Sequence, residues 1–476
     1  MAVFKKDKRK EEKTNLTEAP AEYAPNTETK DAAGHLFTRQ ALVRLIIPLM
    51  IEQALAVTIG VMDSMMVAGV GEEAISAINL VDQINNLLIT VFAAMATGGT
   101  VVVSQYIGHK EIGNARHTAG QLILSVFAIA VGLAGIALLG NRFVLQLVYG
   151  NVEEKVMGYA RTYFRLAALS YPFLALYNGG AALFRAQGNS KISMVTSLII
   201  NGVNMCLNAL FIYGFGMEVF GAGLATLIAR ASAAVAVMAM LRKQKNMIYV
   251  RDYRHLRPDF SSIRRILKIG IPTGLENGLF MVGKILVARQ VAVFGTVAIA
   301  ANAVTLNMAG FQSIAGNGIS LAMVTVVGQC VGADRYDEVR YYVKRLLLFT
   351  CAILLVVNLA LIPLYPVILP LYHLQAETQS IAQVLILVYS GWIVVLWPMA
   401  FWMPNVLRAA GDAKYTMMVS VVSMWLFRIV LCYAFAAWTD WELYGVWVAW
   451  GTDWVARAVC FAARYLSGKW KGKKVI

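Results

Sequence analysis

Four polar residues within apolar stretches of the chain have the types and spacing of a small cation site. Asp63 lies in the first such stretch, about six residues or 9 Å from its outer end at the rise of a helix. Asn204 and Asn208 are one helical turn apart in the fifth stretch, and Thr226 lies at a similar depth in the sixth. A carboxylate, two amides and a hydroxyl form the oxygen-rich set that a proton or a hard monovalent cation would use. In the alternative interpretation, Asp63 faces water in an outer vestibule and the two amides join helices.

A second group of polar residues within apolar stretches could line a cleft or form structural ion pairs. It consists of Glu52, Gln53, Glu276, Lys284, Arg428 and Asp453. Glu52 and Glu276 occupy matching places in two halves of the chain, and they could face a cleft or make hydrogen bonds in helix packing. Arg428 or Lys284 could pair with Asp453, so a salt bridge that holds a bundle together is as good an interpretation as a functional role.

The sequence predicts that these residues lie on membrane-spanning helices. Hydrophobic residues make up 59% of the 476-residue chain and charged residues 14%, against about 45–50% and 25% in an average soluble domain. Twelve apolar stretches reach the length of about 20 residues that a helix needs to cross a bilayer. They are residues 41–69, 74–106, 118–140, 156–184, 192–215, 219–241, 265–294, 297–330, 343–370, 378–407, 415–437 and 442–466.

The basic residues predict the orientation of these helices. With residue 1 in the cytosol, 33 of the 42 Lys and Arg fall on the cytosolic side, which is the asymmetry of inner-membrane proteins. Both termini are therefore expected in the cytosol. We interpret 1–38 as a disordered tail, 39–243 as a six-helix bundle, 244–263 as a basic linker, 264–467 as a second six-helix bundle and 468–476 as a basic tail.

An internal repeat relates the two bundles. Pro48 and Pro272, Glu52 and Glu276, and Gln105 and Gln329 are each 224 positions apart, and LFRAQGNSK at 183–191 returns as VLRAAGDAK at 406–414. Because each copy has an even number of spans, both copies enter the membrane in the same orientation, and their symmetry axis runs along the membrane normal. The predicted fold is all-α, with twelve transmembrane helices in two parallel-oriented bundles around a central cleft.

These motifs together resemble a known family. The duplicated plan, VMDSMMVAG at 61–69, ALFRAQGNSK with its echo, and GQCVGADRY at 328–336 are similar to the multidrug and toxic compound extrusion (MATE) family, over roughly residues 38–466. The resemblance includes the NorM-like and DinF-like bacterial members of that family.

The resemblance implies an antiporter of the bacterial cytoplasmic membrane, driven by H⁺ or Na⁺, that exports bulky and mainly cationic organic compounds by alternating access. It implies that Asp63 anchors the cation site of the first bundle, with Asn204, Asn208 and Thr226. The seventh helix departs from the family pattern, because many NorM-type members carry a glutamate where this chain has Phe280. That departure argues against a sodium site in the second bundle, whose extra basic residues could take an anionic or zwitterionic substrate.

Two other functions are compatible with parts of the sequence. A flippase or exporter of a lipid-linked or anionic substrate is favoured by the basic second bundle. A membrane-embedded enzyme is disfavoured, because all five histidines lie in tails or loops and no intramembrane catalytic or metal-binding set is visible. We therefore expect no cofactor, no metal site and no nucleic-acid partner. The expected partners are a small-molecule substrate, the coupling H⁺ or Na⁺ and membrane lipid, and the chain is expected to be a monomer.

Overall fold

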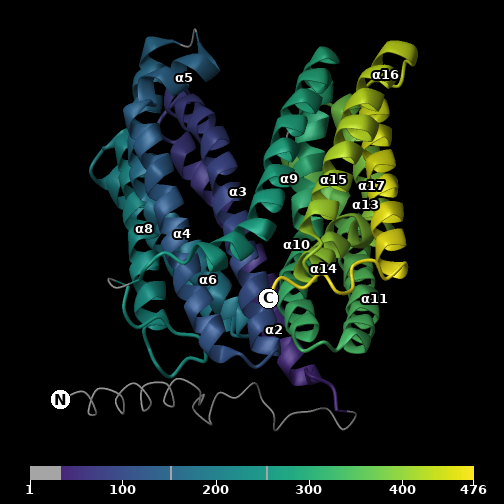
Figure 1. The fold of residues 1–476 in the computed structure, drawn as a ribbon. Helices are drawn as coiled ribbons and strands as arrows, with labels where there is room; N and C mark the ends of the chain where they lie inside the picture. Colours follow the sequence, from purple (N-terminus) through teal and green to yellow (C-terminus); the bar gives the residue numbers. More distant parts are fainter. Residues whose placement is uncertain (1–33, 151–152, 254–255, 373) are drawn as a thin grey trace, which may run out of the picture.

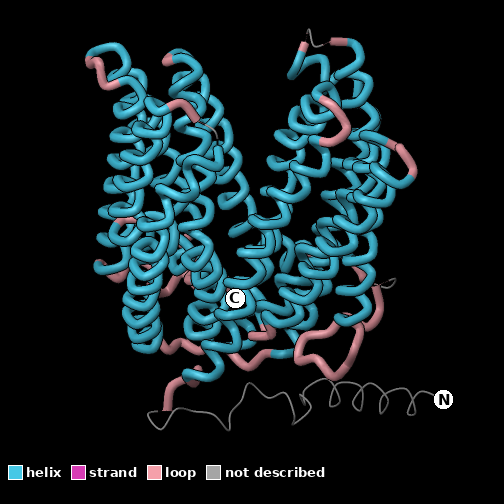
Figure 2. Tube along the Cα trace, turned by 180° about the vertical axis from the view of Figure 1, so that it is seen from behind, coloured by secondary structure: helices cyan, strands magenta, loops and turns pink. Residues whose placement is uncertain are grey.

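The computed structural model describes residues 34–150, 153–253, 256–372 and 374–476, and within them all side chains except those of 59–65, 67–68 and 371. Most of the predicted N-terminal tail, residues 1–33, lies outside the described residues. The secondary structure of the described residues is helical, with helices joined by turns and loops, and it forms two bundles that we call the N-lobe and the C-lobe (Figures 1 and 2).

The apolar stretches of the first half fold into the N-lobe. Its elements are α2 (Arg39–Ala68), α3 (Glu72–Gly108), α4 (Ile112–Leu139), α5 (Asn141–Tyr149), α6 (Glu154–Ala186), α7 (Ser190–Asn208), the π-helical turn η3 (Ala209–Gly214) and α8 (Glu218–Leu241). The helix α5 is short and lies at the outer tip of this lobe (Figure 1).

The second half forms the C-lobe. Its elements are α9 (Phe260–Val293), α10 (Gly295–Gly332), α11 (Tyr336–Leu361), η4 (Ile362–Leu364), α12 (Tyr365–Ile368), η5 (Leu369–Tyr372), α13 (Ala376–Val395), η6 (Pro398–Trp402), α14 (Met403–Ala409), α15 (Ala413–Ser423), η7 (Met424–Val430), α16 (Leu431–Trp438) and α17 (Glu442–Leu466). The segments η6 and η7 are π-helical turns within longer helical rods.

These elements form the twelve membrane-length rods that the sequence predicts. Among the described residues, nine helical segments are long and apolar enough to cross a membrane. The other three rods, α6, α9 and α17, have 33, 34 and 25 residues and are long enough, but they contain more charged or polar residues. Charge inside a membrane-length helix usually marks a functional or structural site. We therefore expect such sites on these three helices.

The φ angles of the backbone also reflect the duplication of the chain. Lys110 and Asp334, 224 positions apart, have φ angles of 64° and 56°, and Glu218 and Glu442, at the same offset, have φ angles of 48° and 44°. Such angles are uncommon for residues other than glycine. Because the same unusual conformation recurs at matching turns, the two lobes are copies of one unit at the level of local geometry.

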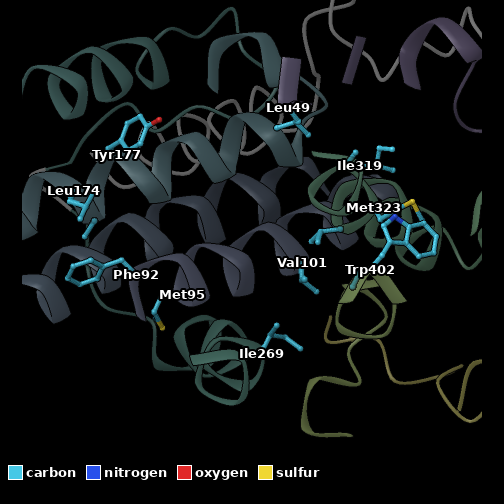
Figure 3. Packing of buried hydrophobic residues seen from close by; sticks show 14 of the residues in the cluster. Leu49, Phe92, Met95, Val101, Leu174, Tyr177, Ile269, Ile319, Met323 and Trp402 are labelled. Atoms are coloured by element: carbon cyan, nitrogen blue, oxygen red, sulfur yellow. The ribbon is translucent and has the colours of Figure 1, made fainter. Parts of the chain in front are cut away.

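The lobes meet at one end and diverge at the other, which gives the molecule the outline of a V (Figures 1 and 2). We call the end that carries the start of α2 and the C-terminus the proximal end, and the open end the distal end. The first helix of each half packs against the second helix of the other half, α2 against α10 and α9 against α3. Buried side chains from both lobes, among them Val101, Ile269 and Ile319, share one apolar core at this junction (Figure 3).

Two reciprocal hydrogen bonds close the proximal seam between the lobes. The Gln105 side-chain amide donates to the Ala409 carbonyl at 2.8 Å, and the Gln329 amide donates to the Ala186 carbonyl at 2.8 Å. Each bond runs from the second helix of one half to the other half. The glutamines that mark the repeat in the sequence therefore form the seam.

Two glycines allow α3 and α10 to cross closely at this seam. A Cβ atom on Gly108 would lie 1.9 Å from the Gln329 carbonyl oxygen, and one on Gly332 would lie 2.0 Å from the Gln105 carbonyl oxygen. Any larger residue would therefore force the two helices apart.

The C-terminal segment, residues 467–476, packs against the proximal seam. The Val475 N–H donates to Gln105 Oε1 at 2.8 Å, which joins this segment to the N-lobe. The Trp470 side chain is buried, and Lys473 Nζ lies 2.8 Å from an Asp412 carboxylate oxygen of the C-lobe. The segment thus contacts both lobes.

The linker between the lobes ends at a helix cap. Asp259 caps α9 by accepting a hydrogen bond from the backbone N–H of Ser261 at 3.0 Å. The Ser262 hydroxyl donates to Asp259 Oδ2 at 2.6 Å, and His117 Nε2 of α4 lies 3.1 Å from the same oxygen. These bonds, with that from Ser262 the largest, lower the pKa of Asp259 to about 2.

Candidate functional site

A polar pocket of about 300 Å³ lies within the N-lobe. It is lined by Ala56 of α2, by Asp82, Asn85, Asn86 and Ile89 of α3, by Tyr163 of α6, by Ile200, Asn201 and Asn204 of α7, and by Thr226, Ala229 and Arg230 of α8. Polar side chains of four helices therefore converge inside a bundle whose helices have the length and composition of membrane spans. Such groups are costly in a membrane unless they bind each other or a ligand.

Among the described residues that line the polar pocket, Asp82 supplies the carboxylate. Its Oδ1 accepts a hydrogen bond from the Asn85 side-chain amide at 3.1 Å and from the Tyr163 hydroxyl at 3.4 Å. The buried Tyr171 hydroxyl in turn donates to Asn85 Oδ1 at 2.7 Å. Because Tyr171 fixes Asn85 and Asn85 holds Asp82, the carboxylate has a defined orientation while it remains half-buried at the pocket wall.

The structure brings together three of the four residues that the sequence singles out as a cation site. The Asn204 amide donates to the Thr226 hydroxyl at 3.3 Å, and the Asn208 amide donates to Asn204 Oδ1 at 3.2 Å. Asn204 and Thr226 line the polar pocket, whereas Asn208 is fully buried where α7 passes into the π-helical turn η3. The fourth residue, Asp63, lies on α2, but its side chain is outside the part that the structure describes.

Sequence reasoning missed Asp82, Tyr163 and Arg230 as members of this site. A signal for Asp82 was present, because the acidic group stands beside three amides in DQINN within an apolar stretch. Tyr163 carried no such signal, since tyrosine is common in apolar helices. Arg230 NH1 donates to the Ser170 hydroxyl at 2.7 Å and places a positive charge in the same pocket.

Glu52 and Glu276 form corresponding ion pairs in the two lobes. Glu52 lies 3.5 Å from Arg185 of α6 and accepts a hydrogen bond from the Ser193 hydroxyl at 2.8 Å. Glu276 lies 2.6 Å from Arg408 of α14. All of these carboxylates and guanidinium groups are largely buried, so the pairs join helices within each lobe. Gln53, the neighbour of Glu52, is half-buried on α2.

A cluster of charges lies in the C-lobe around Asp453. Arg428 Nη2 of η7 lies 2.6 Å from Asp453 Oδ2, and Arg457 Nε of α17 donates to Asp453 Oδ1 at 2.8 Å. The Ser423 hydroxyl donates to the same Oδ1 at 2.6 Å. Of the two partners that the sequence allows for Asp453, the structure therefore shows Arg428. Lys284 has no described carboxylate within ion-pair distance, and its Nζ lies 5.3 Å from the centre of the Phe280 ring.

A second cavity, which we call the basic pocket, adjoins this cluster and has a volume of about 570 Å³. It is lined by Gln83 and Asn86 of α3, Met281, Lys284, Ile285, Val287 and Ala288 of α9, Asn302 and Leu306 of α10, Arg428, and Val446 and Trp450 of α17. Asn86 lines both this cavity and the polar pocket. The two pockets therefore adjoin each other along α3.

A comparison with known protein families identifies the family of this chain. The MatE family model matches the chain twice, at residues 48–210 and 272–434. The chain belongs to the MatE family. Both ends of the two matches are offset by 224 positions, which is the offset of the internal repeat and confirms the duplication.

Curated relatives of this MatE chain are named as a transporter and as a multidrug resistance protein. It is 25% identical over 438 residues to "Uncharacterized transporter YisQ" of Bacillus subtilis, covering 90% of this chain and 94% of YisQ. It is also 25% identical over 456 residues to "Probable multidrug resistance protein NorM" of Thermotoga maritima, covering 92% and 94% of the two chains. MatE is a family of multi-pass membrane transporters for small molecules, not a family of enzymes.

Solved MATE structures have the same fold. One, titled as the outward-facing conformation of a multidrug resistance MATE family transporter, superposes with a TM-score of 0.83 over 90% of this chain and 95% of its own, at 19% identity. Another, from Pyrococcus furiosus, has a TM-score of 0.81 at 19% identity over the same shares, and its title reports a binding pocket of reverse polarity. The predicted family and the twelve-helix fold are thus confirmed.

Proposed function

We propose that this MatE chain is a cation-coupled antiporter that exports bulky organic compounds across the cytoplasmic membrane by alternating access. The observation that carries the proposal is the polar pocket, which Asp82, Asn204 and Thr226 line together inside one bundle. Oxygen ligands of this kind suit H⁺ or Na⁺. Asp63, which the family resemblance assigns to the same site, would supply a second carboxylate.

The closed proximal seam and the open distal end correspond to one of the two states that alternating access requires. The distribution of Lys and Arg favours a cytosolic position for the proximal end. In that orientation the described conformation faces outward. The two-lobed repeat supports a second state in which the seam opens and the distal ends close.

The helix α3 offers a direct mechanical link between the polar pocket and the seam. Asp82 and Gln105 are 23 positions apart on this one helix, which is about 35 Å at 1.5 Å per residue. A cation beside Asp82 competes with the hydrogen bonds from Asn85 and Tyr163. Loading the site therefore changes the packing of α3 on α6, and a rigid helix transmits that change to Gln105.

The test is efflux from proteoliposomes that hold the full chain and a fluorescent organic compound. An inward electrochemical gradient of H⁺ or Na⁺ should drive export, since each charge that moves inward gains about 2.3 kcal/mol per 100 mV of membrane potential. Asp82→Asn and Asp63→Asn should each abolish the gradient-driven part. The matched control is Asp440→Asn, which removes an exposed carboxylate outside the pocket. Undiminished efflux by both Asp82→Asn and Asp63→Asn would contradict the proposal.

An export function for anionic or lipid-linked compounds is a second candidate. It is favoured by one observation, the absence of a carboxylate among the described residues that line the basic pocket.

A further inference from the structure

The basic pocket has the size and lining of a binding site for a drug-sized molecule. Its volume of about 570 Å³ falls within the range of about 300–1,000 Å³ that small-molecule pockets occupy. Most of its wall is apolar, with Met281, Ile285, Leu306 and Val446 among the lining residues. It lies where α9 of the C-lobe faces α3 of the N-lobe, on the distal side of the closed seam (Figure 1).

The charges at this pocket are positive. Lys284 and Arg428 are the charged residues among those that line it, and the N-lobe contributes the neutral amides of Gln83 and Asn86. Lys284 is exposed, so its ammonium group can reach a ligand directly. Organic cations, which the family resemblance implies as cargo, would meet repulsion here.

The nearby carboxylates are already engaged by arginines. Asp453 is fully buried and holds both Arg428 and Arg457, at 2.6 and 2.8 Å. Glu276, two turns before Lys284 on α9, is paired with Arg408 at 2.6 Å. Counting Lys284, Arg428 and Arg457 against Asp453 leaves two positive charges in excess at the pocket.

Aromatic rings hold the arginine at the pocket wall. The Arg428 guanidinium lies 4.8 Å from the centre of the Trp450 ring and 5.1 Å from that of Phe280. Both rings lie within the range of about 6 Å at which a cation is attracted to an aromatic ring, so they stabilise the guanidinium at this wall. Trp450 also lines the pocket and offers a flat surface on which an aromatic ligand can stack.

We propose that the basic pocket binds an organic anion with an aromatic or apolar body, whose acidic group contacts Lys284 and whose body packs against Trp450 and the aliphatic wall. This inference rests on the proposed export function and assigns the charge of the cargo. An amphipathic aromatic acid and the head group of an anionic phospholipid share this chemistry. Competition between fluorescein and phosphatidylglycerol distinguishes these two sources.

The test measures equilibrium binding of two dyes with one ring system and opposite charge, fluorescein as the anion and rhodamine 6G as the cation. The full chain is reconstituted in nanodiscs of phosphatidylcholine, with no ion gradient and at one fixed pH. Fluorescein should bind more tightly than rhodamine 6G. Lys284→Gln should weaken fluorescein binding about tenfold, which corresponds to about 1.4 kcal/mol, and should leave rhodamine binding unchanged or tighter.

Two further variants separate the pocket from the general charge of the protein. Arg289→Gln removes a positive charge from an exposed residue of α9 that does not line the pocket, and it should leave fluorescein binding intact. Lys284→Arg retains the charge and should retain binding. Equal losses in Lys284→Gln and Arg289→Gln, or tighter binding of rhodamine 6G by the wild type, would overturn the proposal.

Nanodiscs that also contain phosphatidylglycerol identify the source of the anion. Displacement of fluorescein by phosphatidylglycerol in the wild type, together with weaker lipid binding by Lys284→Gln, supports the pocket as a lipid site. Retention of fluorescein in the presence of phosphatidylglycerol supports a free aromatic anion as cargo. Because these assays use no gradient, a failure here leaves the cation-driven efflux of the proposed function to be judged separately.

Discussion

Gly332→Ala tests whether the proximal seam holds the lobes in the described conformation. The added Cβ would lie 2.0 Å from the Gln105 carbonyl oxygen, whereas non-bonded carbon and oxygen atoms rarely approach within about 3.2 Å. The helices must therefore move apart by about 1.2 Å. Two hydrogen bonds of the Gln105 side chain, from its amide to the Ala409 carbonyl and from the Val475 N–H to Oε1, are now 2.8 Å long and would stretch beyond hydrogen-bonding distance.

The expected shift in the conformational equilibrium follows from these two bonds. Each is worth about 0.5–1.5 kcal/mol, so their loss destabilises the closed seam by about 1–3 kcal/mol. A change of this size alters the ratio of the two states about 5- to 150-fold. A seam-open state that is now rare would become a substantial fraction of the molecules.

The assay is the distance between spin labels at the distal ends of the two lobes. Leu139 at the end of α4 and Trp438 at the end of α16 are both highly exposed and suit labelling, in a background where the exposed Cys206 is replaced. The wild type should show one long distance, and Gly332→Ala should add a shorter one. The matched control is Gly113→Ala, because a Cβ on Gly113 of α4 would meet nothing within 4 Å.

The repeat provides an independent check on this reasoning. Gly108→Ala places a Cβ 1.9 Å from the Gln329 carbonyl oxygen on the other side of the seam, so it should give the same added distance. An unchanged distance distribution in both Gly108→Ala and Gly332→Ala would refute the view that close contact at the seam stabilises the described conformation.

Three further predictions concern the contacts around the lobes. Gly411→Ala should release the C-terminal segment, because Gly411 has a φ of 99° and a Cβ would lie 2.0 Å from the Lys473 carbonyl oxygen; limited trypsin digestion should then cleave near Lys473 several-fold faster. Glu276→Gln leaves Arg408 without its buried carboxylate and should destabilise the protein by about 3–5 kcal/mol, and an unchanged thermal unfolding temperature would contradict this. Asp259→Ala should be less stable than the wild type at pH 7, because the charged carboxylate stabilises the fold above its unfolded-state pKa of about 4; that difference should shrink as the pH falls toward the folded-state pKa of about 2, as followed by chemical denaturation.

The sequence was sufficient to predict the fold and the relation between its halves. The apolar stretches are long enough to be read as spans, and the repeat is detectable because Glu52, Gln105 and their counterparts are polar residues in apolar surroundings. The structure gives the physical reason why those residues match: Gln105 and Gln329 form the seam, and Glu52 and Glu276 form ion pairs.

The candidate site could be predicted only in part. Depth along a helix follows from residue number, which is why the sequence places Asn204 and Thr226 at a similar depth; in the structure a hydrogen bond joins them. The direction in which each helix faces does not follow from depth, so the approach of Tyr163 to Asp82 was not foreseen. The same limit applies to Asp453, whose possible partners lie at similar depths on different helices.

The packing of the C-terminal segment could not be predicted from the sequence either. Residues 468–476 are predicted as a basic tail because four of them are lysines. The contacts of Trp470 and Val475 depend on a surface that forms only when the two lobes meet. Such a surface has no signature in the local sequence.

The most direct test of cation coupling uses a gradient of the exported compound, in place of a cation gradient, as the driving force. Vesicles containing the full chain would be given only a gradient of the exported compound, and movement of H⁺ or Na⁺ in the opposite direction would be recorded with a pH-sensitive dye or with isotopic sodium. We expect cation movement in the wild type and none in Asp82→Asn, with Asp440→Asn behaving as the wild type. Solute movement without cation movement in the wild type, or equal cation movement in Asp82→Asn, would contradict it.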